Sequence, residues 1–177
     1  EAAVDRKAKM PKHMRLPKME EWQFYNEARL RELYSKEEAA YQERRATKSL
    51  PAHGLRKMQL LSDEDQAEKN RLLAEGFANW SRQQYHNFIK GSAKYGRTDY
   101  TNIAREVGKS VASVTKYATT FWQRAPEIMS PSDMESIMRR VEKGEKKLAY
   151  KHFKTHTDHH PTDAQGWANL AVFTMRE

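Results

Sequence analysis

Four histidines near the C-terminal end form the densest group of side chains that could bind a metal ion. On one helix, His152, His156 and His160 would share a face, an arrangement that metal ligands can adopt. The sequence contains no cysteine, and Pro161 follows the last of these histidines directly. We therefore expect no metal site here, and we interpret this segment, His159 included, as a solvent-exposed tail.

No other group of residues has the spacing of a catalytic or nucleotide-binding motif. The segment Gly108-Lys109-Ser110 ends like a phosphate-binding loop, but that motif requires a glycine where Ile103 stands, and it follows a strand. The acidic side chains fall on amphipathic helix faces, and no Gly-x-Ser-x-Gly elbow occurs. We expect that this chain is not an enzyme and takes no cofactor and no small-molecule substrate.

The cationic side chains carry the more informative pattern. The 177 residues include 32 Lys and Arg against 24 Asp and Glu, a formal net charge of +8. Residues 1–62 hold 14 cations against 9 anions, residues 80–125 hold 8 against 2, and residues 126–177 balance at 8 each. Such an excess favours a polyanionic partner, because each neutralised phosphate releases counterions. The alternative is that the charge serves solubility.

The candidate phosphate-binding side chains come from an N-terminal arm, from residues 80–125 and from one later pair. The arm, residues 1–18, contains two prolines, many lysines and no apolar period, so we expect it to be flexible. The candidates are Arg6, Lys7, Lys9, Lys12, Arg15, Lys18, Lys90, Lys94, Arg97, Lys109, Lys116, Arg124, Arg139 and Arg140.

The elements that must position these side chains are predicted to be helices. Between Glu20 and Ala46, apolar and aromatic residues recur at helical spacing, which predicts one long helix or two. A loop is expected over residues 49–54. The run SDEDQAEKNRLLAEG then begins with a capping serine, Ser62, carries three acids in its first turn and stops at Gly76, which predicts a second helix.

Residues 81–125 predict three short helices joined by tight turns. Ser81 and Gln84 form a capping box, and Asp99 and Ser110 begin the next two helices. We interpret the aromatic side chains as core residues rather than as base-stacking platforms, and we also place Val111 inside. The predicted core residues are Trp80, Phe88, Ile89, Tyr95, Ile103, Val114, Phe121 and Trp122.

The third of these helices and the helix after it bear on how DNA would be bound. The outward face of the third helix offers one lysine, Lys116, and one glutamine, Gln123, so we expect no recognition of a particular base sequence. After Ser130-Pro131, apolar residues recur three, four or seven apart, which predicts a long helix. No stretch alternates like a strand or could span a bilayer, so we predict an all-α fold without a membrane segment.

A resemblance to a SANT domain, the Myb-like three-helix module of chromatin proteins, is carried by residues 76–124, GFANWSRQQYHNFIKGSAKYGRTDYTNIAREVGKSVASVTKYATTFWQR. The segments GFANWSRQQYHNFIK, KYGR, NIAREV and DMESIMRRVEKGEKKL are more narrowly similar to the C-terminal region of imitation-switch (ISWI) chromatin-remodelling ATPases. In that family a HAND domain, a SANT domain, a spacer helix and a SLIDE domain follow the motor. WQFYNEARLRELYSKEEAAYQ and SDEDQAEKNRLLAEGF resemble the HAND helices.

The resemblance implies a domain order along the chain. A basic arm at 1–18 is followed by a HAND-like domain at 19–78, a SANT domain at 79–126 and a spacer helix at 127–150. In the tail at 151–177 no SLIDE pattern is recognisable. The motor lies outside this sequence, so the resemblance places ATP and Mg²⁺ in the parent protein and no cofactor in this chain.

The function that the resemblance implies is to engage a nucleosome beside the motor, in the nucleus, in support of nucleosome sliding and spacing. The expected partners are the nucleosome, linker DNA held through its phosphates, histone tails and accessory remodeller subunits. The alternative is a protein-interaction scaffold that docks an accessory subunit and has no direct DNA role. Salt-dependent binding to unrelated DNA sequences would separate the two.

Overall fold

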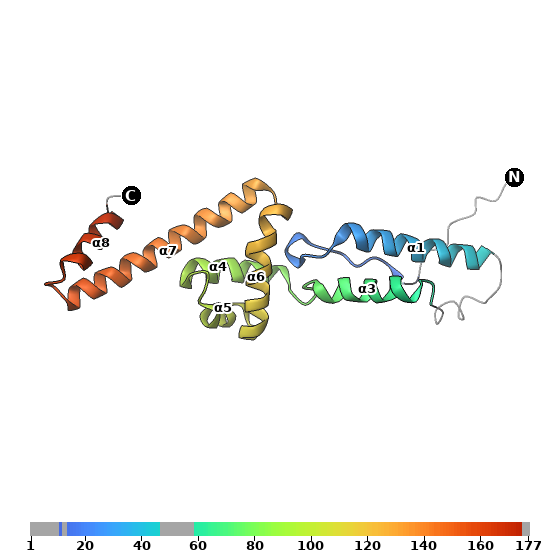
Figure 1. The fold of residues 1–177 in the computed structure, drawn as a ribbon, viewed down its shortest axis with the longest axis horizontal. Coiled ribbons are helices and arrows are strands. Elements are labelled where there is room, and N and C mark those ends of the chain that lie inside the picture. The colour runs from blue at the N-terminus through green and yellow to red at the C-terminus, as the bar shows by residue number, and fades with distance from the viewer. Residues whose placement is uncertain (1–10, 12–13, 47–58, 175–177) are drawn as a thin grey trace. The chain divides into compact units, whose positions relative to one another are not determined.

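The chain is helical in the parts that the structure, a computed structural model, describes: residue 11, residues 14–46 and residues 59–174 (Figure 1). No strand occurs within these residues, which confirms the all-α prediction. None of their helices is long and apolar enough to cross a membrane. The chain divides into two compact units, one ending at Ala78 and the other beginning at Asn79. The helices are η2 (Glu21–Gln23), α1 (Glu27–Ala46), α3 (Asp63–Glu75), α4 (Arg82–Tyr95), α5 (Tyr100–Val107), α6 (Val111–Ile128), α7 (Pro131–His159) and α8 (Ala164–Thr174).

The first unit begins with the short 3-10 helix η2, where the structure differs from the helix expected from Glu20 onward. Phe24 ends this turn with a φ of 54°, in the left-handed region that residues with a side chain rarely adopt. Its ring is 2% exposed and meets the Phe77 ring edge-on at 6.3 Å between centroids. The Phe77 N–H also donates to the Gln23 carbonyl at 2.9 Å. These contacts hold the turn, so α1 begins only at Glu27.

Helices α1 and α3 pack against each other through a narrow apolar strip (Figure 1). Leu30, Leu33 and Tyr34 of α1 form a buried cluster with Leu72 of α3. The predicted start of α3 is confirmed, because the Ser62 hydroxyl accepts a backbone N–H at 3.1 Å. Only four buried apolar residues form this strip, so charged side chains also lie at the contact between the two helices.

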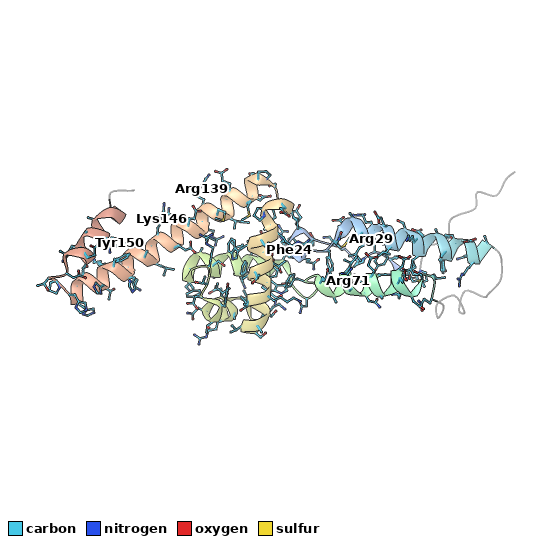
Figure 2. The ribbon with its side chains drawn as sticks, in the orientation of Figure 1. Phe24, Arg29, Arg71, Arg139, Lys146 and Tyr150 are labelled. Atoms are coloured by element: carbon cyan, nitrogen blue, oxygen red, sulfur yellow. The ribbon has the colours of Figure 1, made fainter. Side chains whose placement is uncertain are left out.

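Ion pairs reinforce the contact between α1 and α3. Arg29, labelled in Figure 2, donates from Nε and Nη2 to the Glu68 carboxylate at 3.0 and 2.7 Å. Lys69 Nζ donates to Glu37 Oε2 at 2.5 Å, and each of these two side chains is only 8% exposed. Lys69 Nζ also lies 3.9 Å from the ring centroid of Tyr34. Burial has removed the hydration of this pair, so each charge depends on the other.

The second unit contains the three helices that the capping residues predict. Ser81 and Gln84 form the capping box of α4, Asp99 caps α5, and Ser110 caps α6. Each capping oxygen accepts a backbone N–H at 3.1 to 3.2 Å. Gly108 ends α5 with a φ of 74°, a conformation that suits glycine. The predicted starts of all three helices are therefore confirmed.

Aromatic rings fill the centre of this three-helix unit. Trp80 stacks on Tyr117 with 3.5 Å between ring centroids, and Phe88 meets Tyr117 and Phe121 edge-on at 5.1 and 5.2 Å. Tyr117 is absent from the core predicted from sequence, yet it is fully buried, and burial raises the pKa of its hydroxyl. The predicted core residues that are buried are Trp80, Phe88, Ile89, Ile103, Val114 and Phe121.

Three residues expected inside this unit lie at its margin instead. Tyr95 and Trp122 are half-buried, and the Arg97 guanidinium covers the Trp122 ring at 5.5 Å. Val111 is 44% exposed, because it is the first residue of α6 and projects past the end of the core. Trp122 is thus an edge residue that contacts both the core and a polar side chain.

Helix α6 continues through Pro126 to Ile128, so the expected domain boundary at residue 126 falls inside a helix. Pro126 has no N–H to donate to the Trp122 carbonyl four residues earlier, yet the last turn still closes, because the Met129 N–H donates to the Ala125 carbonyl at 2.9 Å. Ser130 then caps α7, with a proline as its first residue, as the sequence predicts.

Helix α7 crosses α4 at very close range. A Cβ on Gly144 would lie 1.8 Å from the carbonyl oxygen of Ala93, so no side chain fits between the two backbones there. Ile137 and Val141 are buried on the same side of α7. This glycine therefore sets how near the two helices come.

The segment expected to be a solvent-exposed tail is largely helical. Helix α7 runs to His159, beyond the expected end at residue 150, and α8 packs back on it (Figure 1). Gly166 of α8 is buried, and a Cβ there would lie 3.0 Å from Cγ2 of the buried Thr157. The four histidines themselves are exposed on or beside the last turns of α7.

Candidate nucleic-acid interface

The cations of the N-terminal arm are described only in part. Arg15 is exposed, and Lys18 is paired with Glu20 at 2.5 Å between Nζ and Oε1. The remaining candidates of the arm lie outside the described residues; they are Arg6, Lys7, Lys9 and Lys12.

Lys90 and Lys94 of α4 converge on one carboxylate, that of Glu106 on α5. Lys90 Nζ lies 2.5 Å from Oε1 and Lys94 Nζ lies 3.7 Å from Oε2. The hydrogen bond from Lys90 is the main cause that lowers the pKa of Glu106, so the carboxylate is a stable anion. Both lysine side chains are 56% exposed and the glutamate is 17% exposed. Two cations share one anion, which leaves a net positive charge at the surface.

Arg97 contributes to the architecture of the second unit rather than to a free basic surface. Its Nε and Nη2 donate to Glu145 Oε1 and Oε2 at 3.0 and 2.9 Å, and its backbone N–H donates to Oε1 at 3.1 Å. These hydrogen bonds lower the pKa of Glu145 and raise that of Arg97. This bidentate pair of hydrogen bonds connects the turn after α4 to α7.

The other predicted cations of this unit lie in three different settings. Lys109 is half-buried, with Nζ 5.7 Å from the ring centroid of Trp80, a cation–π arrangement. Lys116 is exposed on α6, and Arg124 near the end of that helix is half-buried. Of these three cations, only Lys116 is therefore exposed.

A row of cations along α7 is the strongest candidate interface. Arg140, Lys143, Lys147, Lys151 and Lys154 follow one another three or four residues apart, so their side chains lie along one helix face. All five are exposed, and none has an ion-pair partner among the described residues. We name these five residues the α7 row. At about 1.5 Å per residue the row is about 21 Å long, and duplex DNA presents one charge about every 1.7 Å along its axis.

The α7 row borders the buried face of α7. Val141 follows Arg140 directly, about 100° around the helix, and is fully buried, whereas all five members of the row are exposed. Arg139 and Lys146 flank the row, and Figure 2 shows both on the edge of α7 that faces away from α4. Arg139 Nη2 is paired with Glu135 Oε1 at 2.6 Å. Because Glu145 on the buried side is bound by Arg97, it does not neutralise the row.

The sequence candidates include only Arg140 of this row. The balance of charges over residues 126–177 conceals it, because acids near the ends of that segment offset the cations in its middle. Residues 139–154 alone contain seven Lys and Arg against Glu142 and Glu145. The signal that could have found the row is the spacing of cations by three and four within the predicted long helix.

The histidine group ties α7 to the turn before α8. His156 Nε2 and Asp163 Oδ2 are 2.8 Å apart, and this contact is the main cause that lowers the pKa of Asp163. The rings of His156 and His160 lie 4.7 Å apart between centroids. Within the described parts of the chain, no three His, Asp or Glu side chains are placed to hold a metal ion.

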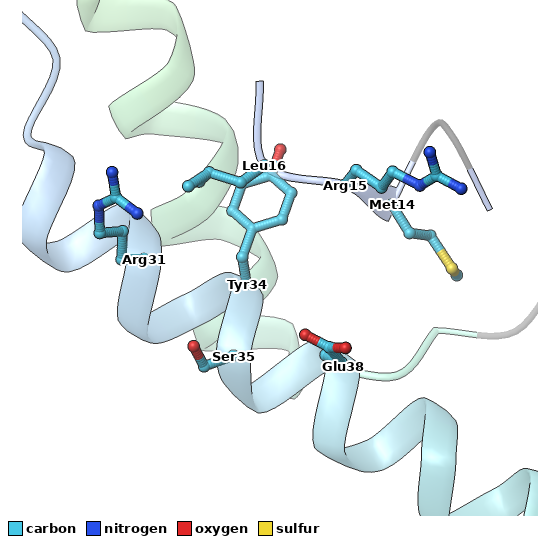
Figure 3. A pocket seen from close by; sticks show the side chains of 7 residues that line it. All are labelled: Met14, Arg15, Leu16, Arg31, Tyr34, Ser35 and Glu38. Atoms are coloured by element: carbon cyan, nitrogen blue, oxygen red, sulfur yellow. The ribbon is translucent and has the colours of Figure 1, made fainter. Parts of the chain in front are cut away.

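A hollow of about 460 Å³ lies in the first unit beside α1 (Figure 3). It lies between the segment just before η2 and one face of α1. Its charged side chains are two arginines and one glutamate, and Arg31 is already paired with Glu27. The lining offers no pair of groups suited to acid–base or nucleophilic chemistry; it consists of Met14, Arg15, Leu16, Arg31, Tyr34, Ser35 and Glu38.

Proteins with similar sequences are chromatin remodellers. The chain is 45% identical over 89 residues to the human SWI/SNF-related matrix-associated actin-dependent regulator of chromatin subfamily A member 1, covering 50% of this chain and 8% of that protein. It is 36% identical over 135 residues to a probable chromatin-remodeling complex ATPase chain of Oryza sativa subsp. japonica, covering 75% and 12%. It is 35% identical over 137 residues to the ISWI chromatin-remodeling complex ATPase CHR17 of Arabidopsis thaliana, covering 74% and 12%. No protein-family model matches the chain.

The matches cover much of this chain and little of each relative. The chain spans between 8% and 12% of the length of these curated relatives. Two of the three matches extend over about three quarters of the chain, so they include more than the three-helix unit alone. The chain matches a C-terminal segment of an ISWI chromatin-remodelling ATPase.

Proposed function

We propose that this chain is the DNA- and nucleosome-engaging accessory module of an ATP-dependent chromatin remodeller. Similarity to ISWI chromatin-remodelling ATPases supports the remodeller context, and the α7 row is the observation that carries the DNA part of the proposal. In this proposal the first unit is the HAND domain, the three-helix unit is the SANT domain and α7 is the spacer helix. The ATPase motor, with its ATP and Mg²⁺, belongs to the rest of the parent protein, which acts in the nucleus.

The α7 row would bind DNA through its phosphates rather than through base edges. Its members are lysines and one arginine on long flexible stems, and they lie on a straight helix face instead of converging on a pocket. Five phosphate contacts imply a slope of about −4.5 in a plot of log affinity against log salt concentration, with little preference for sequence. Contacts with histone tails and with accessory subunits remain predictions from the family resemblance.

The experiment that tests this proposal compares two variants of the whole chain that lose the same number of positive charges. The first variant, Lys143→Gln, Lys147→Gln and Lys151→Gln, removes the centre of the α7 row. The control, Arg31→Gln, Arg45→Gln and Arg71→Gln, removes three exposed cations of the first unit. Affinity for a fluorescent DNA duplex is measured by anisotropy between 50 and 200 mM salt, with a second duplex of unrelated sequence.

The α7 row variant should bind at least about tenfold more weakly at about 100 mM salt, and its salt slope should be less steep by about 2.7. The control should bind within about twofold of the parent chain, because its cations lie outside the row. Equal losses in both variants would show that net charge, not the row, governs binding. Affinity that does not vary with salt would contradict the proposal and favour the protein-interaction scaffold.

A further inference from the structure

Helix α4 presents a second line of basic side chains, which the fold leaves at the surface of the three-helix unit. Arg82, His86, Lys90 and Lys94 follow one another at every fourth position, and all four are exposed. Residues four apart on a helix lie almost one above another, so these side chains form a strip along α4. We name these four residues the α4 strip. By contrast, the outward face of α6 carries a single lysine, Lys116, in its middle.

One end of the α4 strip contains an internal anion. Glu106 reaches across from α5 and binds Lys90 at 2.5 Å and Lys94 at 3.7 Å. Its side chain is 17% exposed, whereas each lysine is 56% exposed, so the carboxylate is sheltered while both ammonium groups remain open to solvent. An ammonium group has three N–H donors; Lys90 donates one of them to Glu106, and Lys94 is held near the carboxylate only as an ion pair. Both lysines can therefore contact a second anion from the solvent side.

A second anion at this place would also meet Glu106. The carboxylate binds the same two ammonium groups that the incoming anion would contact, so the two anions would lie within a few ångströms of each other. Like charges at such distances repel, by an amount that corresponds to about three- to fivefold in affinity when water screens them. Glu106 thus weakens the attraction of Lys90 and Lys94 for an external anion without removing it.

We propose that the α4 strip is a second contact for the phosphates of duplex DNA, and that Glu106 is an internal competitor that limits how tightly it binds. This inference rests on the proposed DNA-binding function and adds a separate site to it. It also assigns DNA contact in the three-helix unit to its first helix rather than to its last. The proposed ligand is a DNA phosphate backbone, because a strip of cations at the regular spacing of a helix suits a regular line of negative charges.

The experiment replaces the competitor by a residue of nearly the same shape and no charge. Glu106→Gln is compared with Glu127→Gln, which removes one exposed carboxylate of α6 and changes the net charge by the same amount. Both variants are made in the whole chain, and circular dichroism and thermal melting confirm the fold. Duplex affinity is measured at about 100 mM salt and across a salt series.

Glu106→Gln should raise affinity about three- to fivefold, with Glu127→Gln remaining close to the parent chain. In a chain that also carries Lys90→Gln and Lys94→Gln, affinity should fall and the effect of Glu106→Gln should disappear, because its two partners are gone. An unchanged or lower affinity in Glu106→Gln, or a gain that persists without the two lysines, would overturn the inference.

The outcome distinguishes this inference from the broader proposal. If the α7 row variant loses affinity while the Glu106 and Lys90 and Lys94 variants bind like the parent chain, only the α4 strip is refuted. If the parent chain shows no salt-dependent binding to DNA, the proposed function itself fails. If Glu106→Gln melts at a lower temperature than the parent, the Lys90→Gln and Lys94→Gln variant alone decides, because loss of affinity there is required by the proposal.

Discussion

The two units of this chain use charged side chains in opposite ways. In the first unit, Arg29 and Lys69 hold α1 and α3 together through ion pairs with Glu68 and Glu37, beside a thin apolar strip. In the second unit, stacked and edge-on aromatic rings form the core of the three-helix unit. That aromatic core contains no ion pair; the Arg97–Glu145 pair lies beside it, and the five cations of the α7 row remain at the surface.

This difference between the two units shows that the number of cations in a segment does not locate a binding surface. Both units are rich in Lys and Arg, and what distinguishes one cation from another is whether it already has an anion within reach. Lys69 is buried with its partner, Lys90 and Lys94 share one partner, and Lys147 has no ion-pair partner among the described residues. These three situations predict three different responses to substitution.

The largest effect should come from the aromatic core of the second unit. Phe121→Ala removes a fully buried ring that contacts Phe88 and Tyr117, and it should lower the free energy of unfolding by about 3 to 5 kcal/mol. Gln123→Ala on the exposed face of the same helix should change it by less than about 0.5 kcal/mol. Urea denaturation with hydrogen exchange of peptides from each unit measures both. A loss confined to the first unit would contradict the comparison.

The next effect should come from the buried ion pair of the first unit. Lys69→Met leaves Glu37 buried without a partner and should cost about 3 kcal/mol. The matched control is Lys36→Met, which breaks a pair with Asp65 at 3.2 Å; the Lys36 side chain is 55% exposed, so the cost should be below about 1 kcal/mol. Protection of amides in α1 and α3 is the measurement. Equal costs for the two lysines would show that burial does not decide the role of a charge.

The smallest effect is a pH dependence of the second unit. The hydrogen bonds from Arg97 lower the pKa of Glu145 in the folded chain. A carboxylate of this kind contributes stability that is complete above its unfolded pKa of about 4.3 and is lost as the pH falls through its lower folded pKa. The unfolding free energy of the second unit should therefore decrease below about pH 4.3. Arg97→Gln should show a shallower decrease in urea titrations between pH 3 and 7; identical slopes would count against this role of the pair.

Much of the fold could be predicted from sequence because local signals decide where helices begin. Ser62, Ser81, Ser110 and Ser130 are hydroxyl caps whose partners lie within the next three residues, so no distant contact is needed to find them. The left-handed turn at Phe24 could not be predicted this way, because contacts with the distant Phe77 ring and backbone hold it.

Tyr117 and Trp122 differ in how far local spacing could have predicted their burial. Tyr117 lies three residues after Val114 and four before Phe121, so helical spacing could have placed it in the core. The margin position of Trp122 is less predictable, because Arg97, which covers its ring, is distant in sequence. For the candidate interface, sequence alone supplies the cations but not the carboxylates that meet them across helices. Glu106 is sixteen residues from Lys90 in sequence, and Glu145 is forty-eight from Arg97. The α7 row was the exception, because its spacing is local.

The backbone contact at Gly144 has a mechanical consequence. Helix α7 has 29 residues, which corresponds to about 43 Å, and its crossing with α4 lies near its middle. The α7 row begins beside this crossing, at Arg140, and extends beyond it to Lys154. The second half of α7 therefore extends from the point where Gly144 contacts the Ala93 carbonyl. If the row binds DNA as proposed, a force on that DNA would act as a torque on the three-helix unit, because the backbones of α7 and α4 are in contact at Gly144.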